Sequence, residues 1–138
     1  MRNLEGWRDS YFTFCFVRNP WDRAVSLWMN CAGDEKFEGF LKRLLVKPIP
    51  RRWIIAVAPQ SRWMAADGKV QVDYAAQFEN YDEEIAYLVG TLELPTRKMA
   101  HLRRTERDPD YKRYYSQEAL DLVNRIYQAD IELLDYEY

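Results

Sequence analysis

The chain has 138 residues, of which 48% are hydrophobic and 15% aromatic, enough for one domain with a buried core and too apolar for a disordered protein. Its formal net charge of −2 argues against non-specific nucleic-acid binding. No apolar run approaches the roughly 18 to 20 residues of a membrane span, and the two cysteines form no Cys-x-x-Cys pair. We therefore expect a single domain over residues 1–138, in a reducing, cytoplasmic setting, without a nucleic-acid partner or membrane segment.

The first predicted elements are a strand and a helix that meet at Arg18. Residues 11–17 form a short, nearly continuous apolar run, which is typical of a strand covered on both faces. Asn19 can cap a following helix, and Pro20 suits the first helical position. One face of that helix is predicted to be apolar, since apolar residues recur at spacings of three and four: Trp21, Ala24, Val25 and Trp28.

Arg18 and Ser26 allow two interpretations. Ser26 lies about two turns into the helix, roughly 9 Å along its axis, within reach of a ligand that the long Arg18 side chain holds. A guanidinium and a hydroxyl could then grip one phosphate along the side of the helix. Alternatively, Arg18 pairs locally with Asp22, and the Ser26 hydroxyl bonds the Asp22 carbonyl.

The remaining predicted elements follow in order. Asp34 is expected to cap a helix that ends at residues 47–50 and whose apolar stripe is Phe37, Phe40, Leu41, Leu44 and Leu45. Asp67-Gly68 indicates a turn or hairpin. Asn80 with Glu83 resembles a capping box for a helix that stops at Gly90. The last helix is expected to begin at Ser116 and to bury Leu120, Val123, Ile126, Tyr127 and Leu134.

Four segments, in the right order, resemble one family. Residues 17–26, Val-Arg-Asn-Pro-Trp-Asp-Arg-Ala-Val-Ser, are similar to the 3′-phosphate-binding motif of sulfotransferases that use 3′-phosphoadenosine 5′-phosphosulfate. Residues 72–80 resemble that family's short strand and its following Phe-Glu-Asn, and residues 101–105 resemble its His-Leu-Asn-Lys-Ser loop. Residues 114–136 resemble its last helix and tail. The resemblance covers most of the chain from Tyr11 onward.

The resemblance implies an α/β, P-loop-like fold and transfer of a sulfuryl group from that nucleotide to a hydroxyl acceptor, without a metal. Arg18 and Ser26 would bind the 3′-phosphate of the donor or of adenosine 3′,5′-bisphosphate. Arg104 and Thr105 would contact the nucleotide, in a segment, residues 96–115, that carries seven Lys or Arg against three acids. Arg103-Arg104-Thr105 keeps the family's cation and hydroxyl but not its amide, and an arginine fork replaces a compact lysine.

The family's Gly- and Lys-containing phosphosulfate loop has no counterpart here, since residues 1–10 contain one glycine and no lysine. We therefore expect a domain truncated at its N-terminus, weak or inactive in sulfuryl transfer as this chain alone. The alternative is a noncatalytic nucleotide-binding or dimerisation module. The catalytic residues are unassigned, because the sole histidine, His101, is more typical of a hydrogen-bonding loop residue than of a general base.

Loss of the family's first strand also affects the sheet. That strand would lie between the strand of residues 11–17 and the one near residues 74–78, so its removal opens two edges. Either these two strands close on each other in a small, helix-rich domain with a reduced sheet, or another chain supplies a strand, which predicts a homodimer.

Overall fold

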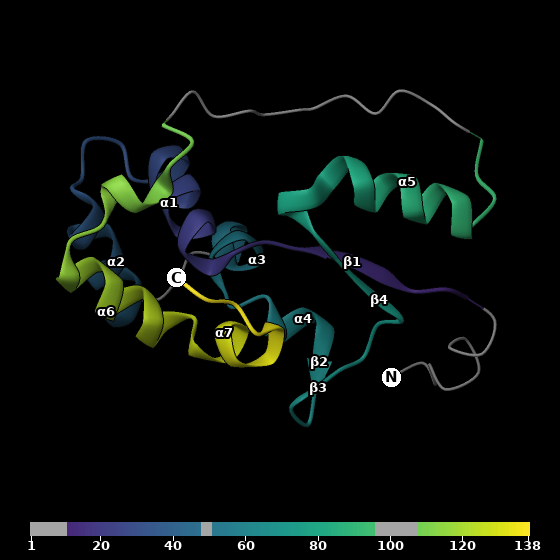
Figure 1. Ribbon diagram of the computed structural model, residues 1–138. Helices are drawn as coiled ribbons and strands as arrows, with labels where there is room; N and C mark the ends of the chain where they lie inside the picture. The colour runs from purple at the N-terminus through teal and green to yellow at the C-terminus, as the bar shows by residue number, and fades with distance from the viewer. Residues whose placement is uncertain (1–10, 48–50, 96–107) are drawn as a thin grey trace.

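A computed structural model describes residues 11–47, 51–95 and 108–138, and it has a helix-rich α/β fold with little sheet (Figure 1). The helices are α1 (Pro20–Cys31), α2 (Phe37–Val46), α3 (Ile54–Val57), α4 (Ser61–Met64), α5 (Tyr81–Thr91), α6 (Gln117–Ile126) and α7 (Gln128–Leu134). The strands are β1 (Phe14–Val17), β2 (Ala65–Ala66), β3 (Lys69–Val70) and β4 (Tyr74–Gln77). Three 3₁₀ turns are η2 (Arg51–Trp53), η3 (Phe78–Asn80) and η4 (Tyr111–Tyr114).

The main sheet consists of β1 and β4, which pair in parallel with Phe14 opposite Tyr74 and Val17 opposite Gln77. The two strands therefore close directly on each other, the first of the two arrangements expected from the sequence. The strand prediction was too long, because β1 begins three residues after Tyr11. β2 and β3 form the antiparallel hairpin expected at Asp67-Gly68, and both turn residues have positive φ, which this tight turn requires.

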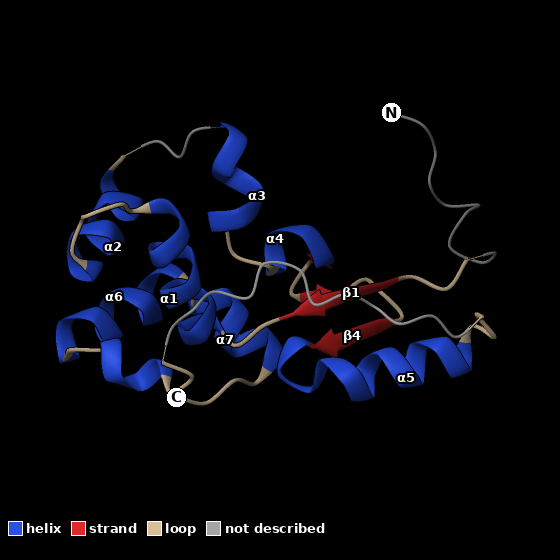
Figure 2. Ribbon diagram, turned by 90° about the horizontal axis from the view of Figure 1, so that it is seen from above, coloured by secondary structure: helices blue, strands red, loops and turns tan. Residues whose placement is uncertain are grey.

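Helices cover both faces of the β1–β4 pair. Side chains alternate between the faces of a strand, so Phe16 reaches Tyr81 of α5, with ring centroids 5.3 Å apart, while Cys15 faces the other way and contacts Met64 of α4. Figure 2 shows α5 along one side of the pair and α4 on the opposite side. Both described cysteines are free and half-buried.

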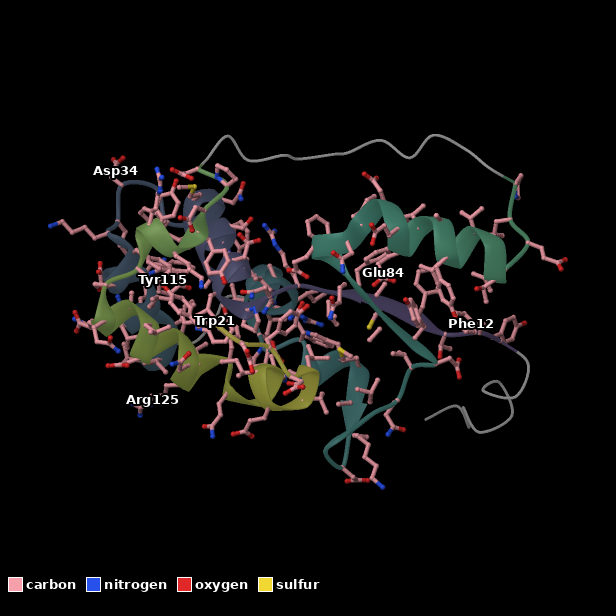
Figure 3. The ribbon with its side chains drawn as sticks, viewed as in Figure 1. Phe12, Trp21, Asp34, Glu84, Tyr115 and Arg125 are labelled. Atoms are coloured by element: carbon pink, nitrogen blue, oxygen red, sulfur yellow. The ribbon has the colours of Figure 1, made fainter. Side chains whose placement is uncertain are left out.

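The hydrophobic core lies away from the sheet, where α1, α2 and α6 pack together on the left of Figure 1. Its buried members are Trp21, Ala24, Val25, Phe37, Phe40, Leu41, Ala119, Val123 and Tyr127. Figure 3 places Trp21 and Tyr115 inside this group of helices, and the Tyr115 hydroxyl donates to the Trp21 carbonyl at 2.9 Å. The apolar stripe predicted for α1 is confirmed for Trp21, Ala24 and Val25.

Several predicted helix ends differ from the structure. The Asn19 cap and Pro20 at the start of α1 are confirmed. The Asp34 cap is wrong, because α2 starts at Phe37 with Lys36 at the cap position and no side-chain cap bond. Asn80 occupies the N-cap position of α5 as predicted, but the capping box itself is wrong, since the Asn80 side chain makes no cap bond. α5 ends at Thr91, one residue beyond Gly90, and Leu45 is 38% exposed rather than part of the core.

The C-terminal segment forms two helices instead of one. Ser116 caps α6 as predicted, since its hydroxyl accepts the Ala119 N–H. The helix then breaks at Tyr127, whose φ of −114° and ψ of 21° are not helical. Val123 and Tyr127 are buried as predicted, and Leu134 is only half-buried. The break turns α7 toward α4, which brings Asp130 to the site described next.

Candidate functional site

The site begins where β1 ends and α1 starts. Asn19 closes the tip of α1, because its side-chain oxygen accepts the N–H groups of Trp21 at 3.0 Å and Asp22 at 3.1 Å. The first free amides of a helix are the groups that would otherwise attract an anion. With two of them already bonded, an anion bound here would lie along the side of α1.

Arg18 occupies this junction with its guanidinium paired to Asp22, four residues later. Nε and Nη2 of Arg18 each lie 2.6 Å from Oδ2 of Asp22, and the guanidinium carbon lies 5.0 Å from the centre of the Phe78 ring. The Arg18 side chain is 24% exposed. The pairing with Asp22 through Nε and Nη2 is the local contact expected from the sequence.

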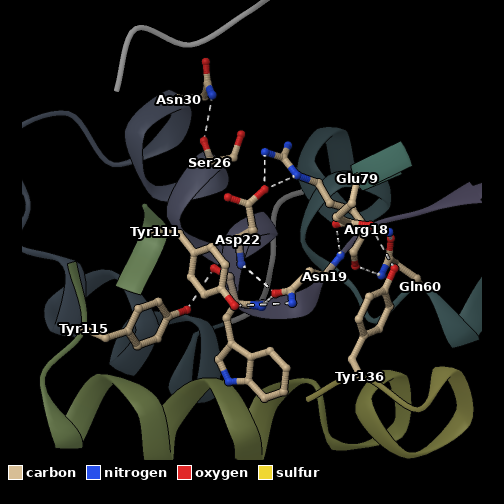
Figure 4. A network of polar contacts seen from close by, with 11 residues as sticks. Arg18, Asn19, Asp22, Ser26, Asn30, Gln60, Glu79, Tyr111, Tyr115 and Tyr136 are labelled. Atoms are coloured by element: carbon tan, nitrogen blue, oxygen red, sulfur yellow. Dashed lines mark hydrogen bonds and ion pairs between the residues drawn. The ribbon is translucent and has the colours of Figure 1, made fainter. Parts of the chain in front are cut away.

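Ser26 lies on the same side of α1 as the Arg18 guanidinium and the Asp22 carboxylate (Figure 4). Ser26 is half-buried, and its carbonyl accepts a bond from Asn30 at 2.7 Å. The bond from its hydroxyl to the Asp22 carbonyl, also expected from the sequence, is not among the contacts of the described residues. A cation, a carboxylate and a hydroxyl therefore follow one another along one helix face.

The backbone of Arg18 is held by a side chain from a distant segment. Gln60 accepts the Arg18 N–H through Oε1 at 3.0 Å and donates from Nε2 to the Arg18 carbonyl at 2.9 Å. These two bonds satisfy both backbone polar groups of a residue that has just left the β1–β4 ladder. The Gln60 amide thus supplies the two hydrogen bonds that a neighbouring strand would otherwise give to Arg18.

Gln60 belongs to a turn over residues 56–61, here called the 56–61 turn. The residue that precedes a proline disfavours helical backbone geometry, so α3 ends before Ala58-Pro59. The last carbonyls of α3 therefore have no partners within the helix. Arg23 Nη2 donates to the carbonyls of Ala56 at 2.6 Å and Ala58 at 2.8 Å. The Tyr127 hydroxyl donates to the intervening Val57 carbonyl at 3.0 Å.

The other end of the 56–61 turn is held by Asp130 of α7. Asp130 is fully buried, and its two oxygens accept the backbone N–H groups of Gln60 and Ser61, each at 2.7 Å. It caps the short helix α4 from a distant part of the chain, so the Gln60 side chain remains available for Arg18. An oxygen of Asp130 also lies 3.9 Å from Nη1 of Arg23. Burial of the Arg23 guanidinium lowers its pKa.

Glu79 connects the start of α1 to the C-terminal tail. Its Oε1 accepts the Asn19 N–H at 2.6 Å, and its Oε2 accepts the Tyr136 hydroxyl at 3.2 Å. Burial, followed by the charge of Glu79, raises the pKa of Tyr136. Glu79, which follows β4, therefore holds the junction that carries Arg18, and Tyr136 of the C-terminal tail holds Glu79 (Figure 4).

We expect Tyr127 to make the protein sensitive to alkaline pH. Burial raises the pKa of Tyr127 to about 12, against about 10 in an unfolded chain. The stability that the neutral Tyr127 side chain contributes is therefore complete below about pH 10 and is lost as the pH rises toward 12, and it amounts to about 3 kcal/mol. Urea unfolding at about pH 9 and about pH 11 should show a smaller loss of stability in Tyr127→Phe than in the wild type.

The control for this titration is Val46→Ala, because Val46 is 77% exposed on α2 and its side chain carries no titratable group. It should lose as much stability between the two pH values as the wild type does. An equal loss in Tyr127→Phe and in the wild type would contradict the assignment to Tyr127.

Of the four residues predicted to bind the nucleotide, the structure places Arg18 and Ser26 together. Arg104 and Thr105 lie outside the described residues, as does His101. Gln60, Glu79 and Asp130 were not predicted. Asp130 carried one usable signal, since it is an acid on a helical face with apolar Tyr127 and Leu134.

Two further properties concern only the described part of the chain. Within residues 11–47, 51–95 and 108–138, no group of three or more His, Cys, Asp or Glu side chains is arranged to hold a metal ion. Over the same ranges, every helix is too short or too polar to cross a membrane.

Comparison with known proteins finds a family and a relative for this chain. A family model with the description "Sulfotransferase family" matches residues 3–137. An uncharacterized protein from Archaeoglobus fulgidus is 31% identical over 107 residues, which cover 76% of this chain and 86% of that protein. No solved structure matches the chain.

Proposed function

The chain belongs to the sulfotransferase family, and from that premise we propose that Arg18 and Ser26 bind the 3′-phosphate of 3′-phosphoadenosine 5′-phosphosulfate. The same two residues would bind adenosine 3′,5′-bisphosphate after the sulfuryl group has been transferred to a hydroxyl acceptor. The observation that carries the proposal is the placement of the Arg18 guanidinium and the Ser26 hydroxyl on one side of α1 (Figure 4).

The chemistry of these residues fits a phosphate. A guanidinium is a planar set of donors with a permanent charge, and a hydroxyl adds one short bond to a phosphate oxygen. Because Asp22 contacts Nε and Nη2 of Arg18, Nη1 is the group that a phosphate beside Ser26 would meet. Asp22 keeps the guanidinium in place, and it also brings a negative charge close to the ligand.

The role proposed for this site is donor binding, with weak or no sulfuryl transfer by this chain alone. Among the described residues, the side chains that contact Arg18 are Asp22, Gln60 and Phe78. None of them supplies the lysine-type charge that in-line transfer uses, and the one carboxylate among them, that of Asp22, is paired with the Arg18 guanidinium. The alternative is a noncatalytic nucleotide-binding module, and transfer of labelled sulfate by the purified chain distinguishes the two.

The nucleotide contacts of a second segment, the cellular location and the oligomeric state stay predictions within this proposal. Arg104 and Thr105 would add a second set of nucleotide contacts. A cytoplasmic location and a homodimer joined through the sheet edges are likewise predictions, which fractionation and light scattering can check.

Removing either side chain of the proposed grip should weaken nucleotide binding. We expect Arg18→Ala to lower the affinity for adenosine 3′,5′-bisphosphate about 100-fold, because a charged donor is lost, and Ser26→Ala to lower it about fivefold to tenfold. Isothermal calorimetry on the wild type and both variants gives the dissociation constants, and circular dichroism verifies that each is folded.

Arg43→Ala is the matched control for Arg18→Ala. Arg43 also pairs with an acid, since its Nη2 lies 2.8 Å from Oε2 of Glu35, but it lies on α2. Its loss should leave the affinity unchanged. A folded wild type that binds no nucleotide, or binding that survives both Arg18→Ala and Ser26→Ala, would contradict the proposal.

A further inference from the structure

The most unusual contact near the site is the double hydrogen bond between one side-chain amide and the backbone of Arg18. The partner is Gln60, 42 residues away in sequence, at 3.0 Å and 2.9 Å. A half-buried glutamine keeps one conformation only if its partners fix it, because ordering a long side chain opposes folding by about 1.5 to 2 kcal/mol. This contact therefore needs a rigid base.

The 56–61 turn is that base. Every carbonyl from Ala56 to Ala58 accepts a bond from Arg23 or Tyr127, and the N–H groups of Gln60 and Ser61 both donate to Asp130. The three side chains that hold the turn come from α1, from the α6–α7 break and from α7. The backbone of Gln60 is thereby fixed relative to both the core and α1.

A fixed Gln60 backbone determines where its amide lies, and the amide determines the backbone of Arg18. Arg18 is the last residue before the Asn19 cap, so small changes in its backbone displace the guanidinium at the end of its long side chain. Asp22 restrains only that far end, through Nε and Nη2. The backbone and the guanidinium of Arg18 are thus restrained separately, the former by Gln60 and the latter by Asp22.

We infer that Gln60 is a positioning residue for anion binding, which holds Arg18 ready for the 3′-phosphate and is itself set by buried Asp130. This inference rests on the proposed function, because it assigns a task to Gln60 in the same site. Gln60 does not contact the phosphate. Its effect on affinity must therefore pass through Arg18.

The first test compares Gln60→Met with the wild type. Methionine keeps the length of the side chain without the two hydrogen bonds, so the affinity for adenosine 3′,5′-bisphosphate should fall about tenfold. In the Arg18→Ala background, Gln60→Met should cause no further loss of nucleotide affinity, because the guanidinium through which Gln60 acts is already absent. Gln60→Asn keeps an amide that is too short to reach Arg18, and it should behave like Gln60→Met.

Gln71→Met is the matched control. Gln71 also donates its amide to backbone carbonyls, those of Ala66 at 3.4 Å and Lys69 at 3.2 Å, but it does so at the β2–β3 hairpin. Its replacement should leave the nucleotide affinity at the wild-type value.

A second measurement does not depend on nucleotide binding. Hydrogen exchange followed by nuclear magnetic resonance should show the backbone N–H of Arg18 exchanging at least about tenfold faster in Gln60→Met, with α1 amides such as that of Val25 unchanged. If the wild type binds no nucleotide, the proposed function fails, and the exchange of the Arg18 N–H still decides whether Gln60 holds Arg18.

Two results would overturn the inference. One is a folded Gln60→Met variant with wild-type affinity and an Arg18 N–H as protected as in the wild type. The other is an equal loss of affinity from Gln60→Met in the wild-type and Arg18→Ala backgrounds, because Gln60 would then act by another route.

Discussion

Replacing Asp130 with alanine is expected to lower the free energy of unfolding by about 3 to 5 kcal/mol, the usual effect of breaking a buried charged pair. The change removes the acceptors of the Gln60 and Ser61 N–H groups. It also removes the carboxylate 3.9 Å from Nη1 of Arg23, a buried atom that has no hydrogen-bond partner among the described residues. Urea unfolding followed by tryptophan fluorescence measures the loss.

Asp121→Ala is the matched control, because Asp121 is an exposed aspartate of α6 that accepts a bond from Gln117. It should change stability by less than about 0.5 kcal/mol. If Asp130→Ala does not fold, Asp130→Asn provides a milder change, since the amide keeps one acceptor while its NH₂ faces a donor. A loss below about 1 kcal/mol in Asp130→Ala would contradict the role assigned to this carboxylate.

Local pattern was sufficient for the elements whose signals lie next to each other in the sequence. Asn19-Pro20 started α1 and Ser116 started α6, because a cap acts within three residues. Asp67-Gly68 gave the hairpin for the same reason. Asp34 satisfied the same pattern and was wrong, since α2 starts at Phe37 after Lys36. Asn80 precedes α5 at the predicted position, but its side chain makes no cap bond and its amide donates to Gln77 instead.

The candidate site was predictable only in part. Arg18 and Ser26 lie on one helix, so their shared side follows from helical spacing. Gln60 lies 42 residues from Arg18 in the sequence. Asp130 lies 70 residues from Gln60. Such pairs carry no periodic signal, because they depend on how the 56–61 turn and α7 pack in three dimensions.

The break at Tyr127 shows why the support of the site could not be predicted. The apolar residues from Leu120 to Leu134 are compatible with one continuous helix. The Tyr127 hydroxyl instead donates to the Val57 carbonyl, and the chain leaves helical geometry at that residue. A tertiary contact with a distant turn thus coincides with the break between the C-terminal helices that sets the position of Asp130.

Replacing Phe40 with alanine should have an effect of similar size, about 3 to 5 kcal/mol, for a different physical reason. Phe40 is 1% exposed and belongs to the core that joins α1, α2 and α6. Its removal loses the burial of a ring and leaves a cavity that these helices cannot fully close. Equilibrium unfolding in urea gives the change in the free energy of unfolding.

Val46→Ala on the same helix is the control for Phe40→Ala, because Val46 is 77% exposed and its loss should alter stability by less than about 0.5 kcal/mol. Phe40→Leu should fall between them, since it keeps much of the buried volume. Equal small losses in Phe40→Ala and Val46→Ala would contradict a core centred on α1, α2 and α6. A large loss confined to Phe40→Ala would support it, because the helix that carries both residues would then be stabilised through its buried face alone.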